Sequence, residues 1–303
     1  MQTFDTLIQM MAAFPDEQTA IDHFTAIRWK NSEFCPYCGS VRVYHFSDKR
    51  THKCADCRKR FSIKVGTIFE DSKIELRVWM MAIWLITSHK KGIASTQLAK
   101  DLGVTQKTAW FMTQRLRYAI RTKSFNAPLD GDIEADEMYH GGKEKNKHAS
   151  QRKGGTQGGS GKLAVLGMLQ RSGQLRTAIA ENTKGTTVQG IIKANVLAGS
   201  NLMTDSHSAF NRLGSIYNHE RVNHTLGEYV RGGIYHTNGI ESVWALFKRQ
   251  IIGTHHFLST KHFGRYLGEM TWRFNERHTG EGNRVNSLLA LANGRLTYKE
   301  LIA

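Results

Sequence analysis

The spacing of apolar residues predicts helices in the first part of the chain. Residues 1–29 carry the pattern of two short amphipathic helices, and Pro15 stands where the second should begin, because proline fits the first turn of a helix. Residues 76–86 are almost continuously apolar, which is typical of a buried helix. Between these helices, residues 40–54 carry β-type residues on both sides of a polar turn at 48–50, which predicts a strand hairpin.

The next stretch predicts two helices separated at Gly103. Ser95 can cap a helix that ends at Leu102, and Thr105 can cap a second helix that continues to about Arg121. The pair has the outline of a helix-turn-helix, although a hairpin of two helices around any glycine turn looks the same. Four apolar residues of the second helix share one face and should meet the core, namely Ala109, Met112, Leu116 and Ala119. Six polar residues are left for solvent or DNA, namely Gln106, Lys107, Thr108, Gln114, Arg115 and Arg117.

The second part of the chain changes to short strands and separate helices. Residues 130–139 alternate as a strand, and residues 162–181 read as two strands joined by a Ser-Gly turn. A helix at 186–198 and a short strand at 200–205 follow, with a further strand from about residue 219. This order predicts a mixed α/β sheet rather than a pure alternation of parallel strands and helices.

Three helices are predicted towards the end of the sequence. The first begins near Asn238, the second spans residues 258–278, and the third, at 286–296, is expected to dock on the sheet. The apolar stripe of the first consists of Ile240, Val243, Trp244, Phe247 and Ile251. The stripe of the second is interpreted as core rather than as a surface for stacked bases, and consists of Phe263, Tyr266, Leu267, Met270 and Phe274.

The charge of the chain indicates a polyanionic partner. Lysine and arginine number 42 against 26 acidic residues, which gives a formal net charge of +16 and a pI near 9.8. Such a surface usually meets nucleic acid, with an anionic membrane as the alternative. No segment approaches the roughly 18 apolar residues that a membrane-spanning helix needs, and the N-terminus lacks an apolar signal core. We therefore expect an intracellular protein that binds nucleic acid.

All four cysteines lie in one short segment. Cys35 and Cys38 form one C-x-x-C pair, and Cys54 and Cys57 form a second, at the spacing of two zinc knuckles that share a tetrahedral site. Four thiolates leave no open position for a substrate water, so we expect one structural Zn²⁺ ion. Basic residues around the hairpin are expected to contact DNA phosphate, unless they form an ordinary solvated face: Arg50, Lys53, Arg58 and Lys59.

The predicted strand at residues 130–139 carries a group of acids. Solubility does not explain a cluster of carboxylates in a basic protein. Because close carboxylates raise one another's pKa unless a cation neutralises them, the cluster indicates a divalent metal site. Alternation places Asp132, Glu134, Asp136 and Met138 on one side of the strand and Ile133, Ala135, Glu137 and Tyr139 on the other.

Two further acids are candidates for the same site. Asp205 ends the strand at 200–205, where α/β sheets carry their chemistry, although it could equally cap a helix formed by the next residues. Glu241 and Lys248 lie two turns apart on the helix that begins near Asn238. If both side chains belong to one site, Glu241 would bind metal and Lys248 would bind phosphate. The alternative is that they form an ordinary pair on the surface.

Glycine and lysine dominate residues 141–162. Loops of this length inside a compact domain are uncommon and usually either functional or plain linkers. We expect the loop to become ordered on a phosphate backbone through Lys143, Lys145 and Lys147, with a flexible linker as the alternative.

Taken in order along the chain, these motifs resemble the DDE transposases of bacterial insertion sequences. The resemblance covers nearly the whole chain, through CPYC, CADC, EADEMYHGG, MTDSHSAF and HTNGIESVWALFKRQ. The family joins a zinc ribbon and a helix-turn-helix to an integrase-like catalytic domain, so the resemblance implies an α/β multidomain protein with a mixed RNase H-like catalytic domain. The expected regions are N-terminal helices (1–32), a zinc ribbon (33–70), a helix-turn-helix region (71–124), an RNase H-like catalytic domain (125–280) and C-terminal helices (281–303).

The resemblance also implies roles for single residues. Asp136 matches the family's first acid and Asp205 the second. Glu241 matches the third, with Asn238 as an assisting or replacing ligand because some relatives carry asparagine there, and Lys248 matches the family's basic residue. An amide brings no charge to a metal, so Glu241 is the preferred ligand. Such a site holds two Mg²⁺ or Mn²⁺ ions about 3.5–4 Å apart for DNA cleavage and strand transfer.

The function implied is a DNA transposase that binds the terminal inverted repeats of a mobile element and joins them to target DNA. Bringing two ends together implies at least a homodimer on double-stranded DNA, in the bacterial cytoplasm at the nucleoid. Two other functions fit the same residues, namely a transcriptional regulator that binds DNA without catalysis and a hydrolytic RNase H-like nuclease. Metal-dependent cleavage separates a transposase from the first, and strand transfer separates it from the second.

Overall fold

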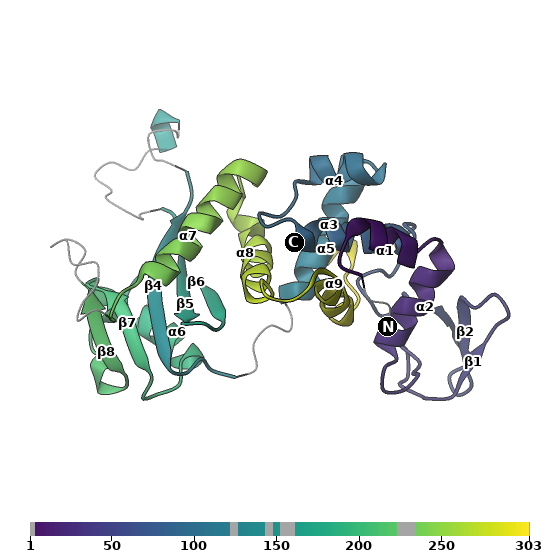
Figure 1. Cartoon of the computed structure of the whole chain (residues 1–303), viewed down its shortest axis with the longest axis horizontal. Coiled ribbons are helices and arrows are strands. Elements are labelled where there is room, and N and C mark those ends of the chain that lie inside the picture. Colours follow the sequence, from purple (N-terminus) through teal and green to yellow (C-terminus); the bar gives the residue numbers. More distant parts are fainter. Residues whose placement is uncertain (1–3, 122–126, 143–147, 152–160, 223–233, 303) are drawn as a thin grey trace. The chain divides into compact units, whose positions relative to one another are not determined.

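The computed structural model describes residues 4–121, 127–142, 148–151, 161–222 and 234–302. The contacts divide the chain into two compact units (Figure 1). One unit, here the helical unit, consists of Met1–Ser124 together with Glu276–Ala303. The other, here the sheet unit, consists of Phe125–Asn275.

The helical unit contains a three-stranded antiparallel sheet. Cys54, the first residue of the second C-x-x-C pair, lies on one of its strands. Its strands are β1 (Val43–His45), β2 (Thr51–Cys54) and β3 (Arg60–Ser62), in that order. The first two strands form the predicted hairpin, and the Asp48 carboxylate closes the turn by accepting hydrogen bonds from the backbone N–H groups of Arg50 and Thr51, both at 2.9 Å. The third strand was not predicted from the sequence.

Helices make up the rest of this unit. They are α1 (Leu7–Ala13), α2 (Glu17–Arg28), α3 (Leu76–Ser88), α4 (Ser95–Leu102), α5 (Gln106–Arg121), α9 (Glu281–Ala290) and α10 (Tyr298–Ile302). Gly103 ends α4 with a φ of 65°, in the left-handed conformation that glycine adopts without strain, and the Thr105 hydroxyl caps α5 by accepting from Thr108 N at 3.2 Å. The cap predicted for α4 was wrong, because Ala94 holds that position and Ser95 Oγ accepts from Gln106 Nε2 instead.

The α9 helix belongs to the helical unit, where it packs against α2 and α3. Arg284 Nη1 donates to the Thr87 carbonyl at 2.9 Å, and His23 Nε2 lies 2.8 Å from Asn286 Oδ1. The expectation that this segment docks on the second sheet was therefore wrong. An apolar stripe shows that a helix joins a core but does not show which core, and here the chain returns to its first unit after Asn275.

The sheet unit is built on five strands in the order β6-β5-β4-β7-β8 (Figure 1). The central strand β4 pairs antiparallel with β5 and parallel with β7, so the sheet is mixed as predicted. The predicted hairpin is formed by β5 and β6, and Ser172 in its turn has a φ of 58°. The strands are β4 (Asp132–His140), β5 (Leu163–Gln170), β6 (Leu175–Ala180), β7 (Asn201–Asp205) and β8 (Asn218–Val222).

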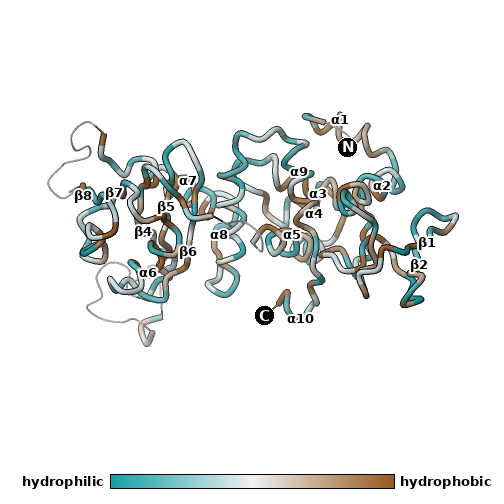
Figure 2. Tube along the Cα trace, turned by 90° about the horizontal axis from the view of Figure 1, so that it is seen from below, coloured by the Kyte–Doolittle hydropathy of each residue, from teal (hydrophilic) through white to brown (hydrophobic). Residues whose placement is uncertain are grey.

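Helices cover both faces of this sheet. The helix α6 (Gly185–Asn195) packs over Ile133 and Ala135, and α7 (Asn238–Gln250) and α8 (Thr260–Asn275) pack over Met138 on the other face. Apolar residues follow β4 and β5 accordingly (Figure 2). The predicted stripe of α7 is buried, and a π-helical turn (Ile251–His255) extends that helix. Among the described residues this unit also has the 3₁₀ segments η2 (Ala149–Gln151), η3 (Ser208–Phe210) and η4 (Leu213–Ser215).

Gly167 of β5 pairs with Asp136 of β4 in the sheet. Because glycine has no side chain, α7 can lie directly on the sheet at this position. A Cβ atom at this position would lie 2.4 Å from Trp244 Cζ2 and 2.8 Å from Ile240 Cδ1. We therefore expect Gly167→Ala to lower the free energy of unfolding by ~1–3 kcal/mol, measured by thermal or denaturant unfolding. The control is Gly190→Ala at an exposed position of α6. No neighbouring side chain lies within 4 Å of a Cβ atom there, and alanine should raise the free energy of unfolding by up to ~1 kcal/mol. Equal stability of Gly167→Ala and wild type would contradict the tight contact.

Candidate active site and zinc centre

Asp136 lies in the middle of β4, on the same side of the strand as Met138. Its pKa is raised to about 7, first by burial and then by the charges of Glu137, Asp205 and Glu241. These charges come from β4, β7 and α7, and they act on Asp136 only because the three elements bring them close. The structure thus gathers the carboxylates of Asp136, Asp205 and Glu241 in one neighbourhood.

Asp205 lies at the carboxyl end of β7, beside Asp136. The parallel register pairs Ala135 with Thr204, so the next residue of each strand falls at the same level. The backbone N–H of His207 donates to Asp205 Oδ1 at 2.9 Å. The alternative role of Asp205 as the cap of a helix was wrong, because the following residues form the 3₁₀ segments η3 and η4, and His207 caps the first of them.

The candidates on α7 lie in and beyond its first turn. Asn238, Glu241 and Lys248 are all exposed, at the edge of the buried apolar stripe as predicted. The Thr237 hydroxyl, which is itself buried, donates to Glu241 Oε1 at 2.9 Å and so fixes the direction of that carboxylate. All three side chains can therefore reach solvent or a ligand while the helix beneath them is anchored in the core.

Glu137 is a fourth acid of this neighbourhood that sequence reasoning set aside. Burial and the charge of Asp205 raise its pKa to about 7, and Oε1 lies 3.4 Å from His207 Nδ1. Oε2 is buried, and no described residue forms a hydrogen bond with it. Strand alternation places Glu137 on the opposite side from Asp136, which is why the pattern separated them. The available signal was the adjacent Asp-Glu pair next to a parallel neighbouring strand that ends in Asp205.

This donor set fits a divalent cation. Carboxylate oxygens are the ligands that Mg²⁺ and Mn²⁺ prefer, and two protonatable acids together with one unpartnered buried oxygen show that negative charge is crowded here. Among the described residues, the four cysteines form a second candidate metal site.

The four cysteines form a compact group in the helical unit. Their sulfur atoms all lie within 4.8 Å of one another, and Cys35 and Cys57 are 3.6 Å apart, as are Cys38 and Cys54. A hydrogen bond from Cys57 N lowers the pKa of Cys54 to about 6, which favours the thiolate that zinc binds. Four sulfur ligands at this separation fit one tetrahedral structural Zn²⁺ ion.

Two known protein domains are similar to different parts of this chain. Residues 128–275 match the ISXO2-like transposase domain, and residues 15–60 match the transposase zinc-ribbon domain. The chain belongs to the ISXO2-like DDE transposases, with an N-terminal zinc ribbon. The first match covers most of the sheet unit, including Asp136, Asp205 and Glu241, and the second covers all four cysteines.

Two proteins that are similar to this chain have names that refer to a transposable element or to a transposase. An uncharacterized protein in transposable element ISH50 of Halobacterium salinarum is 28% identical over 253 residues, which cover 78% of this chain and 83% of the relative. An uncharacterized transposase-like protein of Haemophilus influenzae is 29% identical over 121 residues, covering 40% of this chain and 94% of the relative. Because the first relative is archaeal, the comparisons do not show the expected bacterial origin. No solved structure matches the chain.

The residues that we expected to contact DNA have different surroundings. Arg50, Arg58 and Lys59 are exposed around the zinc ribbon, and Lys59 Nζ lies 4.8 Å from the centre of the Tyr37 ring, whereas Lys53 is half-buried in β2. Gln106 and Lys107 are exposed at the start of α5. Three further candidates lie outside the described residues, namely Lys143, Lys145 and Lys147. Among the described residues, no helix is both long and apolar enough to span a bilayer.

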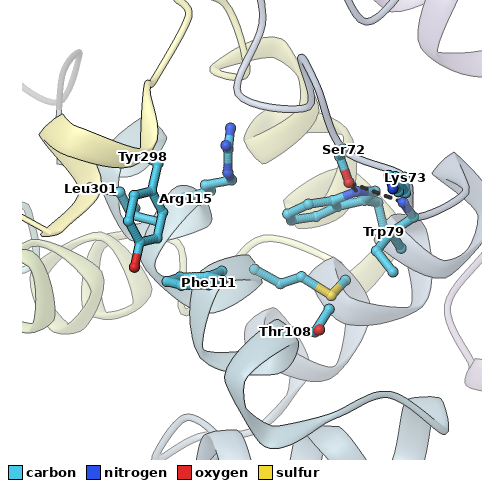
Figure 3. Close-up of a pocket in the computed structure, with 10 residues that line it drawn as sticks. Ser72, Lys73, Trp79, Thr108, Phe111, Arg115, Tyr298 and Leu301 are labelled. Carbon is cyan, nitrogen blue, oxygen red and sulfur yellow. Dashed lines mark hydrogen bonds between the residues drawn. The ribbon is translucent and has the colours of Figure 1, made fainter.

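The second half of α5 is more deeply buried than the sequence indicated. Gln114 and Arg117 are buried, so the expectation that they face solvent or DNA was wrong. Arg115 is half-buried and donates to the Ile68 carbonyl at 2.6 Å. It lines a pocket of about 250 Å³ with Thr108 and Tyr298, bounded by α3, α5 and α10 (Figure 3). Because α5 packs against several helices, more than one of its faces is buried.

Without metal, the acidic site should make the protein less stable as the pH rises. The native state holds protons on Asp136 and Glu137 up to about pH 7, whereas the unfolded chain loses them near 3.8 and 4.5. Unfolding therefore releases protons between about pH 4 and 7, and the free energy of unfolding falls as the pH rises through this window. Buried histidines with lowered pKa, such as His52, act in the opposite direction, so a variant is needed to separate the two.

Glu137→Gln removes one of these titrating groups and leaves the histidines unchanged. In metal-free buffer, the variant and wild type should melt alike near pH 4, where Glu137 is neutral in the native state and mostly neutral in the unfolded chain. Near pH 8 the variant should melt several degrees higher, as measured by calorimetry, because it lacks a buried charge facing Asp205. A difference in melting temperature that does not change with pH would contradict the raised pKa.

Proposed function

We propose that this protein cuts DNA at the ends of a mobile element and joins those ends to target DNA, with Asp136, Asp205 and Glu241 holding two Mg²⁺ or Mn²⁺ ions. The observation that carries the proposal is the placement of Asp136 and Asp205 at the same level of the adjacent parallel strands β4 and β7, with Glu241 of α7 close enough for its charge to raise the pKa of Asp136. A protein with a net charge of +16 gains nothing in solubility from partly burying these acids together. Binding of divalent cations would explain why these acids lie close together.

The architecture supports the domain roles that the family implies. A central strand that pairs antiparallel with one strand of a hairpin and parallel with β7, which itself pairs parallel with β8, is the arrangement expected of an RNase H-like catalytic domain, which we assign to residues 125–280. The α4 and α5 helices with their Gly103 turn support a helix-turn-helix within residues 71–124. We assign the zinc ribbon to residues 33–70 and the flanking helical regions to residues 1–32 and 281–303.

In this site the chain's own residues divide the work. Asp136 occupies the centre, where burial and three neighbouring acids concentrate negative charge. Thr237 holds the Glu241 carboxylate, and Lys248, two turns further along α7, is placed to contact a phosphate oxygen. Bound divalent ions would supply activation of a water or 3′-hydroxyl and stabilisation of the leaving oxygen. Exposed basic residues of the ribbon and of α5 would hold the DNA backbone.

The test is an assay with a labelled DNA end from the sequence that flanks the gene. With Mg²⁺ or Mn²⁺ the purified protein should nick this end and join it to a plasmid, and EDTA should abolish both products. Cleavage without joining would indicate a hydrolytic nuclease. DNA binding without cleavage would indicate a regulator, and either result would contradict the proposal.

The third ligand can be identified with two variants. We expect Glu241→Gln to lower the rate of end cleavage at least ~100-fold and Asn238→Ala to lower it at most ~10-fold, since a carboxylate contributes charge to a metal and an amide does not. Initial cleavage rates at equal DNA occupancy, set by gel-shift titration, measure the effect. A larger loss in Asn238→Ala would assign the ligand to the asparagine instead.

A further inference from the structure

Glu134 is a buried carboxylate that lies next to the proposed metal site without belonging to it. It precedes Asp136 by two residues on β4, on the same side of the strand, and is only 1% exposed. Oε1 lies 3.0 Å from Arg171 Nε and 3.3 Å from His236 Nδ1, and Oε2 accepts a hydrogen bond from Ile240 N at 3.0 Å. A buried carboxylate is costly unless its oxygens are paired, and here both are used.

The partners of Glu134 all belong to one clamp around the start of α7. Arg171, in the turn between β5 and β6, also donates from Nη1 to the Ile234 carbonyl at 2.8 Å and from Nη2 to the His236 carbonyl at 3.2 Å. The Ile240 N–H is one of the amides that a helix start leaves without a helical partner, and these favour a negative charge. Glu134 and Arg171 therefore bind the first turn of α7 and the segment before it.

The clamp depends on close approach of the helix to the carboxylate. A Cβ atom on Gly239 would lie 2.7 Å from Glu134 Oε2, so a side chain at this position would have to displace the Glu134 carboxylate. Glu241 stands in the same turn, two residues after Gly239. Glu134 and Asp136 share one side of one strand. The strand that carries Asp136 is thus tied directly to the helical turn that carries Glu241.

We propose that Glu134 is a positioning residue which, together with Arg171, holds Glu241 at the distance from Asp136 that divalent cation binding requires. The proposal rests on the proposed function, since it assumes that these two acids share ions. Glu134 itself stays out of the ligand set, because Oε1 accepts a hydrogen bond from Arg171 and Oε2 accepts one from Ile240 N.

The test measures Mn²⁺ binding to the whole protein without DNA, by calorimetry or by the electron paramagnetic resonance signal of unbound Mn²⁺. Wild type should bind Mn²⁺, and Asp136→Asn should abolish this binding. Glu134→Gln, which keeps the shape but loses the charge, should weaken binding ~10-fold. The matched control is Asp132→Asn, an exposed acid on the same side of β4 that pairs with Asn201, and it should bind as wild type does.

A double variant separates positioning from general stability. Glu134→Gln combined with Glu241→Gln should bind no more weakly than Glu241→Gln alone, because Glu134 acts through Glu241. If Glu134→Gln lowers only the melting temperature while the folded protein binds Mn²⁺ like wild type, the proposal is overturned. Should Glu134→Gln fail to fold, Arg171→Gln, whose side chain is 26% exposed, carries the same expectation.

The controls also distinguish the two proposals. If wild type and Asp136→Asn bind Mn²⁺ alike, the metal site itself is wrong and the positioning role is wrong with it. If binding depends on Asp136 but is unchanged in both Glu134→Gln and Arg171→Gln, only the positioning role is wrong.

Discussion

Asparagine in place of Asp136 is expected to lower DNA end cleavage and joining at least ~10³-fold, a loss of about 4 kcal/mol of transition-state stabilisation. Asp136 is the acid on which the charges of Glu137, Asp205 and Glu241 act, so we propose that it is the central ligand for the divalent ions. Asparagine keeps the shape of the side chain and removes its charge. Because the neighbouring acids repel Asp136, this change should not destabilise the metal-free fold.

Rates of nicking and joining on a labelled element end measure the effect, with gel-shift affinity as a check on DNA binding. Asp132→Asn serves as the matched control, since it makes the same chemical change on the same side of β4 at an exposed position hydrogen-bonded to Asn201. The control should keep both activity and affinity. Cleavage by Asp136→Asn within tenfold of wild type would remove Asp136 from the centre of the site.

Removal of zinc is expected to unfold the ribbon while the sheet unit stays folded. The strands β1, β2 and β3 contain three, four and three residues, too few to be stable without the metal. Structural zinc sites of this kind contribute on the order of 10–16 kcal/mol of binding free energy to folding. Cys54→Ser, or a strong chelator, should therefore release about one zinc per chain and abolish the ordered ribbon.

Trp29 offers a signal for this unfolding. Its ring lies 4.9 Å from the ring of His52 and 6.1 Å from that of His45, both on the ribbon, so loss of the ribbon should change its fluorescence. The change should be absent in Trp29→Phe, while zinc release should be the same in that variant. A zinc-free protein with unchanged fluorescence and unchanged hydrogen exchange in β1 to β3 would show that the ribbon does not need the metal.

Spacing alone predicted the parts of this molecule in which chemistry and geometry are local. The four cysteines were recognisable because two C-x-x-C pairs at this separation have few other uses. The buried stripe of α7 followed from helical periodicity, since that helix packs with one face on a sheet. The mixed sheet was predicted because two strands of the second part of the chain form a hairpin before the helix that follows them. A purely parallel sheet would not contain such a hairpin.

Prediction failed where burial depends on distant neighbours. Gln114 and Arg117 are polar but buried, because α5 is surrounded by other helices rather than lying on a surface. Glu134 was grouped with the metal acids, whereas its oxygens are occupied by Arg171 and α7. No local pattern shows that an arginine from a strand turn will meet a helix start. Glu137 was set aside by alternation although the end of β7 brings Asp205 towards it.

The division of the chain has a consequence for how the protein is made. The sheet unit is inserted into the helical unit, whose core includes Val285, Leu288 and Leu289 of α9. During translation α9 leaves the ribosome after the entire sheet unit, so the helical unit cannot complete its core until the acids that we propose as catalytic have been synthesised. A prematurely terminated chain therefore lacks a finished copy of the part that we propose binds DNA. Truncated products should not occupy element ends and block the whole enzyme from them.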